Sequence, residues 1–241
     1  MIFKPKSKLT QADYFFYDEV CSLMDIGKRV AALEFCSKHK LVPHFFMVGC
    51  DEVVLLETET SIIVSVSGSD KDPEEWGGNV NAYRGIIDAI KKVPANKAGF
   101  HYNFYLQARK LKRAVKKWLK ENGCKKPVIW VGHSRGGAIA RIAYMLHNCE
   151  YNLIPPMAIV FDPPRSFTWF GWLWYQKNKM SKDVCHRIKA FTLLIGVGSV
   201  PPAFLGWVHR SSTLLRLPNV RGKLNHTHIK EGLIRKFCKE N

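Results

Sequence analysis

The chain has 241 residues, of which 46% are hydrophobic and 24% are charged, and these fractions are those of a folded protein rather than a disordered chain. Its formal net charge is +17, because residues 91–241 carry 28 lysines and arginines but only 6 acids. This excess is either simply solvated or faces an anionic partner, for which lipid headgroups and nucleic acid are the candidates.

The seven cysteines are widely spaced, and their odd number without a C-x-x-C pair predicts neither a disulfide framework nor a zinc site. The first 16 residues have no apolar core of signal-peptide length. The uncharged run 190–208 contains Pro201 and Pro202, which would break a membrane-spanning helix. We therefore expect a cytoplasmic protein without a transmembrane segment, compatible with peripheral contact with membranes, and we expect no cofactor and no metal.

The amino-terminal part of the chain predicts two helices followed by strands. The helices run from Thr10 to about Asp25 and from Ile26 to Lys38. Segments rich in Val, Ile and Phe at Pro43–Val54 and Thr60–Val66 suggest a meander. The second of these contains a continuous apolar run, as in a strand covered on both faces, and a glycine-containing loop follows at 67–79.

A short helix is predicted over Tyr83–Val93 and a long amphipathic one over His101–Asn122. One face of the long helix is the most basic patch of the chain, although such faces are more often solvated than used for binding. Its cations are Arg109, Lys110, Lys112, Arg113, Lys116, Lys117 and Lys120. The later predicted elements are three strands and a closing helix, at Pro156–Phe161, Arg187–Ile195, Thr213–Leu217 and His228–Lys239.

The central motif is Gly132-His133-Ser134-Arg135-Gly136, which lies between an apolar run at Val128–Val131 and an alanine-rich helical pattern. In a strand–turn–helix context, G-x-S-x-G is the nucleophile elbow of a serine hydrolase. The glycines let strand and helix approach, and the helix directs its N–H groups toward a developing oxyanion. Alternating strands and helices predict a mostly parallel sheet in a single domain over 1–241, with 1–42 as a helical segment packed on it.

A nucleophilic serine needs a base, and the base needs an orienting acid. Asp162 is the best acid candidate, because it stands at the carboxyl end of the strand that follows the elbow unit. The alternative is a turn aspartate before Pro163 and Pro164. His226 and His228 occupy a polar loop before the last predicted helix, and we prefer His226 because it is further from the helix body.

The chain resembles the class 3 (fungal-type) lipases of the α/β-hydrolase superfamily over roughly residues 45–235. GHSRGGAIA resembles their GHSLGGALA, with Arg135 in place of leucine, and IIVSVSGSDKDPEEW resembles their strand-plus-loop motif. GFHYNF resembles the segment that opens the helix before the elbow, VFDPPR their Phe-Gly-x-Pro-Arg, and NHTHI their histidine segment.

This resemblance implies an α/β-hydrolase fold, with a mostly parallel central sheet flanked by helices. It implies Ser134 as nucleophile, His226 as base with His228 as alternate, and an oxyanion hole formed by the backbone N–H groups of Ser69 and Arg135. The loop 70–79 corresponds to the family's lid region.

Two departures from the family pattern concern charged residues. Gly198 stands where the family has its acid, while Asp162 stands where the family has glycine. The simplest reconciliation moves the acid one strand earlier, and the alternative is that the acid is lost. In addition, Ser67 replaces the family's arginine beside the oxyanion loop.

These features predict a serine hydrolase that cleaves carboxylic esters of lipids, as a triacylglycerol lipase or a phospholipase A. The aromatic run Phe167–Tyr175, which is either core or a lipid-facing surface, and the positive charge favour a lipid ester substrate and contact with anionic membranes. The alternatives are a catalytically weak or inactive lipase-like protein that binds anionic lipid membranes, and a small-ester or thioester hydrolase. No nucleic-acid-binding motif is recognised.

Overall fold

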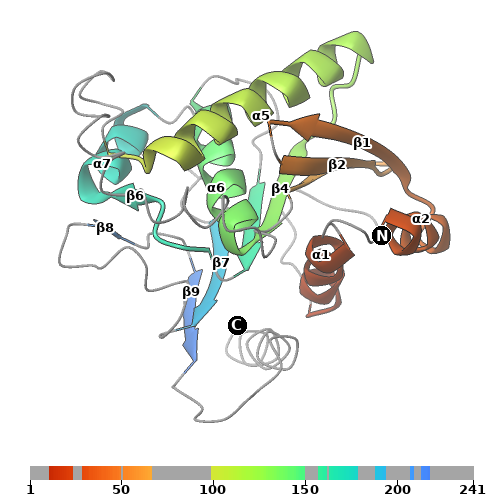
Figure 1. Cartoon of the computed structure of the whole chain (residues 1–241), viewed down its shortest axis with the longest axis horizontal. Coiled ribbons are helices and arrows are strands. Elements are labelled where there is room, and N and C mark those ends of the chain that lie inside the picture. The colour runs from red at the N-terminus through yellow and green to blue at the C-terminus, as the bar shows by residue number, and fades with distance from the viewer. Residues whose placement is uncertain are drawn as a thin grey trace.

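A computed structural model describes residues 11–23, 29–49, 51–66, 99–149, 157–161, 163–178, 188–193, 207–208 and 213–217. Its centre is a mixed sheet of seven strands in the order β1-β2-β3-β4-β5-β7-β9 (Figure 1). These strands are β1 (Val42–Val48), β2 (Asp51–Glu57), β3 (Ile62–Val66), β4 (Val128–His133), β5 (Met157–Phe161), β7 (Ile188–Leu193) and β9 (Thr213–Leu217). A second sheet pairs β6 (Phe167–Thr168) with β8 (Trp207–Val208). The helices are α1 (Gln11–Leu23), α2 (Arg29–Lys38), α5 (Tyr102–Glu121), α6 (Ser134–Asn148) and α7 (Trp169–Asn178).

The sheet joins an antiparallel meander to a parallel region. β1, β2 and β3 pair antiparallel, whereas β3, β4, β5, β7 and β9 pair parallel in that order. This arrangement confirms the predicted α/β-hydrolase class with a mostly parallel sheet. The predicted meander is confirmed in β1, β2 and β3, and the segment 43–54 contains its first turn, at Gly49, whose φ of 69° lies in the left-handed region that glycine adopts without strain.

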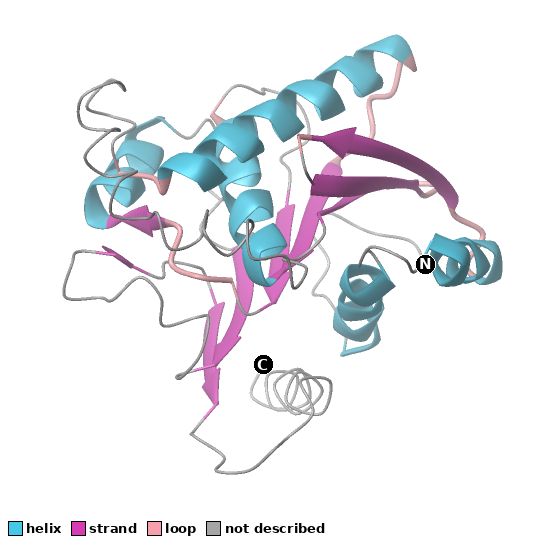
Figure 2. Ribbon diagram, viewed as in Figure 1, coloured by secondary structure: helices cyan, strands magenta, loops and turns pink. Residues whose placement is uncertain are grey.

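The sheet is covered by helices on both faces (Figure 2). Side chains at alternate positions of β3 and β4 serve opposite faces, as the period of a strand requires. Ile62, Val64 and Trp130 belong to the cluster under α5 and α6, while Ile63 and Ile129 belong to the cluster under α1 and α2. The continuous apolar run of β3 is therefore explained by burial on both sides.

The predicted amino-terminal helices are confirmed in α1 and α2, which pack on the sheet through Tyr14, Val20 and Phe35. The helices predicted at 83–93 and 228–239 lie outside the described residues. The single domain over 1–241 stays a prediction. Among the described residues, no helix combines the length and apolar character needed to cross a membrane.

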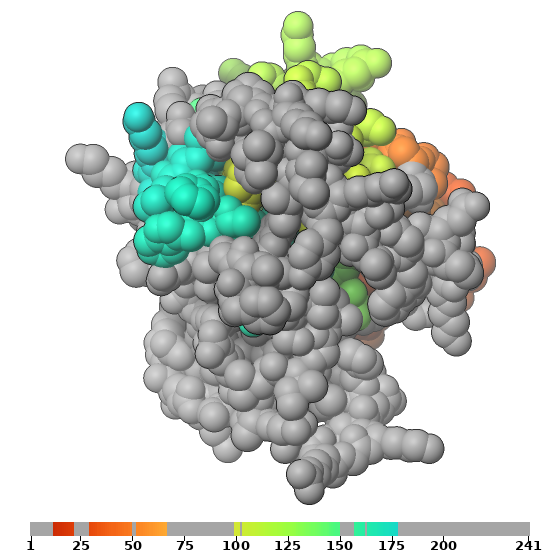
Figure 3. All heavy atoms as spheres, turned by 60° about the vertical axis from the view of Figure 1, so that its left-hand side comes forward, coloured from red at the N-terminus to blue at the C-terminus, as the bar shows by residue number. Residues whose placement is uncertain are grey.

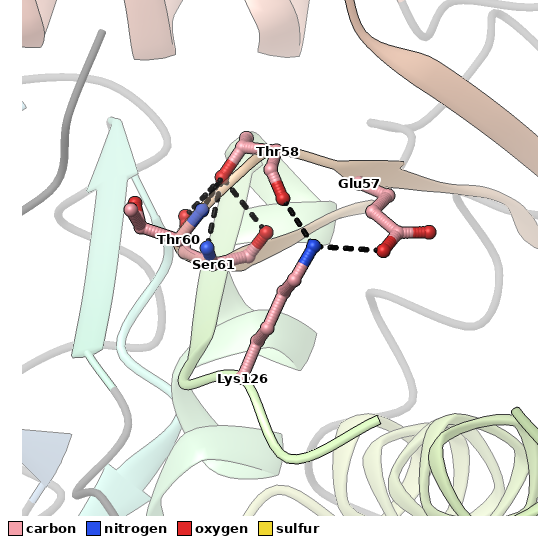
Figure 4. A network of polar contacts seen from close by, with 5 residues as sticks. All are labelled: Glu57, Thr58, Thr60, Ser61 and Lys126. Carbon is pink, nitrogen blue, oxygen red and sulfur yellow. Dashed lines mark hydrogen bonds and ion pairs between the residues drawn. The ribbon is translucent and has the colours of Figure 1, made fainter. Parts of the chain in front are cut away.

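A lysine ties the turn between β2 and β3 to the loop before β4 (Figure 4). The ammonium group of Lys126 donates to a carboxylate oxygen of Glu57 at 2.8 Å and to the backbone carbonyl of Thr58 at 2.6 Å. The Thr58 hydroxyl oxygen in turn accepts from the backbone N–H of Ser61 at 2.9 Å. The network holds the amino end of β3 beside the residues that lead into β4. It therefore supports the register in which β3 pairs with β4.

We expect Lys126→Met to lower the free energy of unfolding by about 1 kcal/mol, because the variant keeps the apolar stem but removes both charge-assisted hydrogen bonds. Denaturant unfolding measures the change. Lys117→Met is the matched control: Lys117 pairs with Glu121 at 3.7 Å on an exposed surface, and its loss should cost less than about 0.5 kcal/mol. Equal losses in the two variants would contradict the structural role of Lys126.

Candidate active site

The carboxyl ends of β3, β4 and β5 meet at one edge of the sheet. Val66 at the end of β3 pairs with Gly132, and Phe161 at the end of β5 pairs with His133. Open parallel sheets gather their ligands outside the carboxyl ends of the strands. Ser134, which directly follows β4, therefore stands at the edge where such a site is expected.

Ser134 has a strained backbone. Its φ is 51°, in the left-handed region that costs a residue with a side chain roughly 1–2 kcal/mol. The preceding residue, His133, is still extended with φ −114° and ψ 147°, and α6 begins at Ser134 itself. The chain thus changes from strand to helix at a single residue, which is the predicted strand–turn–helix context of G-x-S-x-G.

The turn is tight enough to exclude side chains at the neighbouring glycines. A Cβ atom on Gly132 would lie 2.5 Å from the carbonyl carbon and oxygen of Gly136 and 2.7 Å from the backbone nitrogen of Gly137. A Cβ on Gly137 would lie 3.0 Å from the carbonyl oxygen of Gly132. The strand and the helix therefore touch backbone to backbone.

Gly137 was not singled out from the sequence. The signal was present in the Gly136-Gly137 doublet, because a second glycine beyond the motif is not required by G-x-S-x-G itself.

The amino end of α6 lies at Ser134, where its free N–H groups favour a negative charge. The first four N–H groups of a helix point out of its end, and Ser134 and Arg135 provide the first two of them here. The positive end of the helix dipole favours negative charge at this point. The Arg135 side chain is buried.

α6 is held from all sides, since every residue from Arg135 to Asn148 is buried. Trp130 of β4 donates from Nε1 to Nδ1 of His147 at 3.3 Å. The Tyr175 hydroxyl donates to the Tyr144 hydroxyl at 3.3 Å and accepts from Asn148 at 3.3 Å. Burial, with Tyr144 beside it, raises the pKa of Tyr175 well above its usual range, so this hydroxyl stays protonated. His147, which accepts the hydrogen bond from Trp130, therefore packs at the end of α6 that is far from Ser134.

A fully buried arginine links α6 to the segment after β5. The Arg141 guanidinium carbon lies 4.3 Å from the ring centroid of Phe167, a cation–π contact. Burial lowers the pKa of Arg141 to about 9, which leaves it charged at neutral pH. Arg141 is two helical turns beyond Ser134, so Phe167 at the start of β6 contacts the elbow helix two turns from its amino end.

The chain neighbours of Asp162 both flank the elbow. Phe161 pairs with His133, and the Cβ of Pro163 lies 3.3 Å from where a Cβ on Gly137 would sit. Asp162 itself lies outside the described residues, as do Ser69, His226, His228, Ser67, Gly198 and the loop 70–79. Of the predicted site residues, the structure describes Ser134 and Arg135, and it brings these two together at the start of α6.

A cavity of about 140 Å³ lies at the opposite edge of the sheet. Its lining comes from α1, the segment after α2 and the turn before β3, and includes Tyr17, His39, Glu59 and Ser61. It opens at the amino end of β3, whereas Ser134 follows the carboxyl end of β4, so the cavity is separate from the elbow. Among the described residues, no three His, Cys, Asp or Glu side chains lie together as metal ligands.

The sequence matches the family described as lipase (class 3) over residues 63–188, just over half of the chain. This range runs from β3 to the first residue of β7, and so contains the elbow and the strands on both sides of it. No curated protein sequence matches the chain significantly.

Solved structures of fungal lipases share the fold. A fungal lipase in complex with an inhibitor has 14% identity and a TM-score of 0.62, with 83% of this chain and 77% of that chain covered. Triacylglyceride lipase of Rhizomucor miehei has 14% identity and a TM-score of 0.56, with 82% and 77% covered. Lipase II of Rhizopus niveus has 16% identity and a TM-score of 0.55, with 83% and 77% covered.

We expect Ser134→Gly to be more stable than Ser134→Ala by about 1 kcal/mol, because glycine adopts the φ of 51° without the strain that a Cβ brings. Both variants lack the hydroxyl, so their difference isolates the backbone. Denaturant midpoints of the two variants measure it. A glycine variant no more stable than the alanine variant would contradict a strained elbow.

We expect Gly132→Ala to lower the free energy of unfolding by about 3 kcal/mol, because its methyl group would meet the backbone of Gly136 and force strand and helix apart. Gly123→Ala is the control: Gly123 has a φ of 59° but nothing within 4 Å of its Cβ position, and should cost only about 1 kcal/mol. Thermal and denaturant unfolding compare the two, and a larger loss at Gly123 would speak against the backbone contact.

Proposed function

The chain belongs to the class 3 lipase family, and from that premise we propose that it hydrolyses carboxylic esters of lipids through an acyl-serine intermediate on Ser134. The family is one of carboxylic ester hydrolases that act on lipid esters. The observation that carries the proposal is the backbone of Ser134, whose φ of 51° places a serine at the point where β4 turns into a buried helix.

In the first half of the proposed reaction, the hydroxyl oxygen of Ser134 attacks the acyl carbonyl carbon and its proton passes to His226. The carbonyl becomes an oxyanion that accepts hydrogen bonds from the backbone N–H groups of Arg135 and Ser69. Each such donor lowers the barrier by about 2.7–4 kcal/mol in hydrolases where one has been removed. The imidazolium then protonates the leaving alcohol, and the acyl group stays on Ser134.

In the second half, water attacks the acyl-serine. His226 takes a proton from that water and returns it to the Ser134 oxygen as the fatty acid leaves, so the serine is regenerated. The reaction consumes one water per ester and releases one alcohol and one acid.

Asp162 is the proposed orienting acid, which holds the histidine in the tautomer that accepts the serine proton. Its support is positional. Phe161 pairs with His133, Pro163 faces Gly137, and these are the residues immediately before and after Asp162 in the chain. Gly198, which stands where the family has its acid, has no carboxylate for this task.

We propose triacylglycerols or phospholipids as the esters and contact with anionic membranes as the setting, with the net charge of +17 in support. A second candidate function follows from Gly198. If no carboxylate orients the histidine, the same fold binds lipid with little or no turnover. The two candidates share the lipid and differ in the chemistry at Ser134.

The test is labelling by a fluorophosphonate probe in the presence of detergent, followed by ester turnover. We expect the wild-type protein to be labelled at Ser134 and the Ser134→Ala variant to remain unlabelled. Asp162→Asn should reduce kcat by about 10⁴-fold, the loss seen when a triad aspartate is replaced. Mass spectrometry of the labelled peptide locates the modified residue.

Histidine variants separate the two candidate bases. His226→Ala should remove turnover, whereas the control His228→Ala should retain most of it. Circular dichroism verifies that each variant is folded. A wild-type protein that takes no label, with lipid present, would rule out the acyl-serine mechanism and leave the lipid-binding candidate.

A further inference from the structure

α7 is apolar on the side that faces solvent as well as on the side that faces the core. Its ten residues, WFGWLWYQKN, contain no acid. Gly171 and Tyr175 are buried on the inner side, whereas Trp169, Phe170 and Leu173 are 42%, 75% and 46% exposed. Figure 3, which turns this side of the molecule forward, shows α7 at the surface in turquoise. A surface helix normally carries polar residues on its outer side, so this one indicates a binding partner.

The position of α7 is fixed by contacts on its inner side. Gly171 lies against the backbone of Gly99, close enough that neither residue has room for a Cβ. The segment before α5 pairs with the segment before α7 through the hydrogen bonds Thr168 N–H to Gly99 carbonyl at 2.6 Å and His101 N–H to Ser166 carbonyl at 2.9 Å. With Tyr175 on Tyr144, these contacts leave α7 no freedom to turn its exposed residues inward.

The exposed residues form one face of the helix. Trp169, Phe170, Leu173 and Lys177 follow one another at spacings of one, three and four, so they share the side opposite Gly171 and Tyr175. We call these four residues the α7 face. Its tryptophan belongs to a residue type that is enriched where proteins meet the membrane–water interface, and Lys177 closes the face at its carboxyl end. At ten residues, α7 is half the length needed to span a bilayer.

Positive charge lies on the helix that starts beside α7 and runs away from it. α5 begins beside α7, as Figure 1 shows, and it carries Arg109, Lys110, Arg113, Lys116, Lys117 and Lys120 on its exposed side. Lys112, which the sequence placed with these cations, is buried instead. With a net charge of +17 on the chain, two copies repel each other, whereas an anionic surface attracts either copy.

We infer that the α7 face is a docking surface for anionic lipid bilayers, into which Phe170, Leu173 and Trp169 insert while Lys177 and the α5 cations face the headgroups. The choice of lipid over other anionic partners rests on the proposed function. The geometry suits that function, because Arg141, which holds Phe167 just before α7, lies about 10 Å along α6 from Ser134. Docking at α7 therefore brings lipid to the same face of the sheet as α6, the helix that begins at Ser134.

The test measures binding to vesicles by sedimentation, in a Ser134→Ala background that excludes turnover. The vesicles are phosphatidylcholine with and without about 30 mol % phosphatidylserine. We expect tight binding only to the anionic vesicles, weakened at high salt because screening shortens the reach of the charges. Phe170→Ser should weaken binding by about ten-fold, and Trp169→Ser with Leu173→Ser by more.

The matched control uses exposed apolar residues on the other side of the sheet. Val30 and Leu33 of α2 are 70% and 48% exposed, but they share their surface with Arg29 and Glu34. Val30→Ser and Leu33→Ser should leave vesicle binding within about two-fold of the parent. Because Phe170 is mostly exposed, its variant should fold normally, which thermal unfolding verifies.

Three results would overturn the inference: no binding of the parent to anionic vesicles, equal binding by the parent and the α7-face variants, or equal losses in the α2 controls. Sedimentation velocity and binding of a single-stranded oligonucleotide test the other partners. If the α7-face variants lose self-association or oligonucleotide binding but keep vesicle binding, the face serves that partner instead.

Turnover separates this inference from the proposed function. In the wild-type background, the Phe170→Ser variant should hydrolyse a soluble short-chain ester at the parent rate while losing activity on vesicles. A protein that binds vesicles through α7 but hydrolyses neither substrate contradicts the proposed function and leaves the docking surface standing. A protein that hydrolyses the soluble ester but binds vesicles independently of α7 contradicts the docking surface and leaves the proposed function standing.

Discussion

The contact between the backbones of Gly132 and Gly136 is the constraint on which the rest of the site depends. Because strand and helix touch there without side chains, the chain must change from strand to helix at one residue. That residue is Ser134, and the turn holds it at a φ of 51°. A strain of 1–2 kcal/mol is a noticeable part of the roughly 5–15 kcal/mol that stabilises a typical domain. The strain persists because α6 is packed on every side and has no lower-energy position to relax into.

The buried helix α6 makes polar contacts with β4 and α7. Trp130, Tyr144 and Asn148 place hydrogen-bonding groups on or under the helix, and each group has a partner across the packing interface. Directional contacts fix the rotation of α6 about its axis more sharply than apolar packing does. Since Ser134 is the first residue of the same helix, these contacts several turns away also fix the orientation of Ser134.

Most of the fold could be predicted from the sequence where burial is one-sided and therefore periodic. The buried positions of α5 recur every three or four residues, and its predicted bounds of 101–122 agree with Tyr102–Glu121. α7 could not be predicted, because its inner and outer sides are both aromatic and leave no period to detect. The meander of β1, β2 and β3 could be predicted as well, because its strands are rich in Val, Ile and Phe.

The candidate site was predictable as far as local sequence determines it. Ser134 and its glycines form a contiguous motif, and the structure gives them the expected strand, turn and helix. The placement of residues 161 and 163 beside the elbow depends on the pairing of β4 with β5 and on packing against Gly137, neither of which has a local sequence signal. The choice between His226 and His228 likewise depends on long-range packing, which has no local sequence signal.

Pro43 has a consequence for self-assembly of the sheet. β1 is an outer strand, and the two hydrophobic side chains it exposes, Val42 and Met47, lie at its two ends. An outer strand of this kind offers a template to which a strand of another molecule can add, and proline removes one of the N–H donors such an addition requires. Pro43 thus acts against edge-to-edge aggregation, a hazard that grows wherever many copies are concentrated in two dimensions.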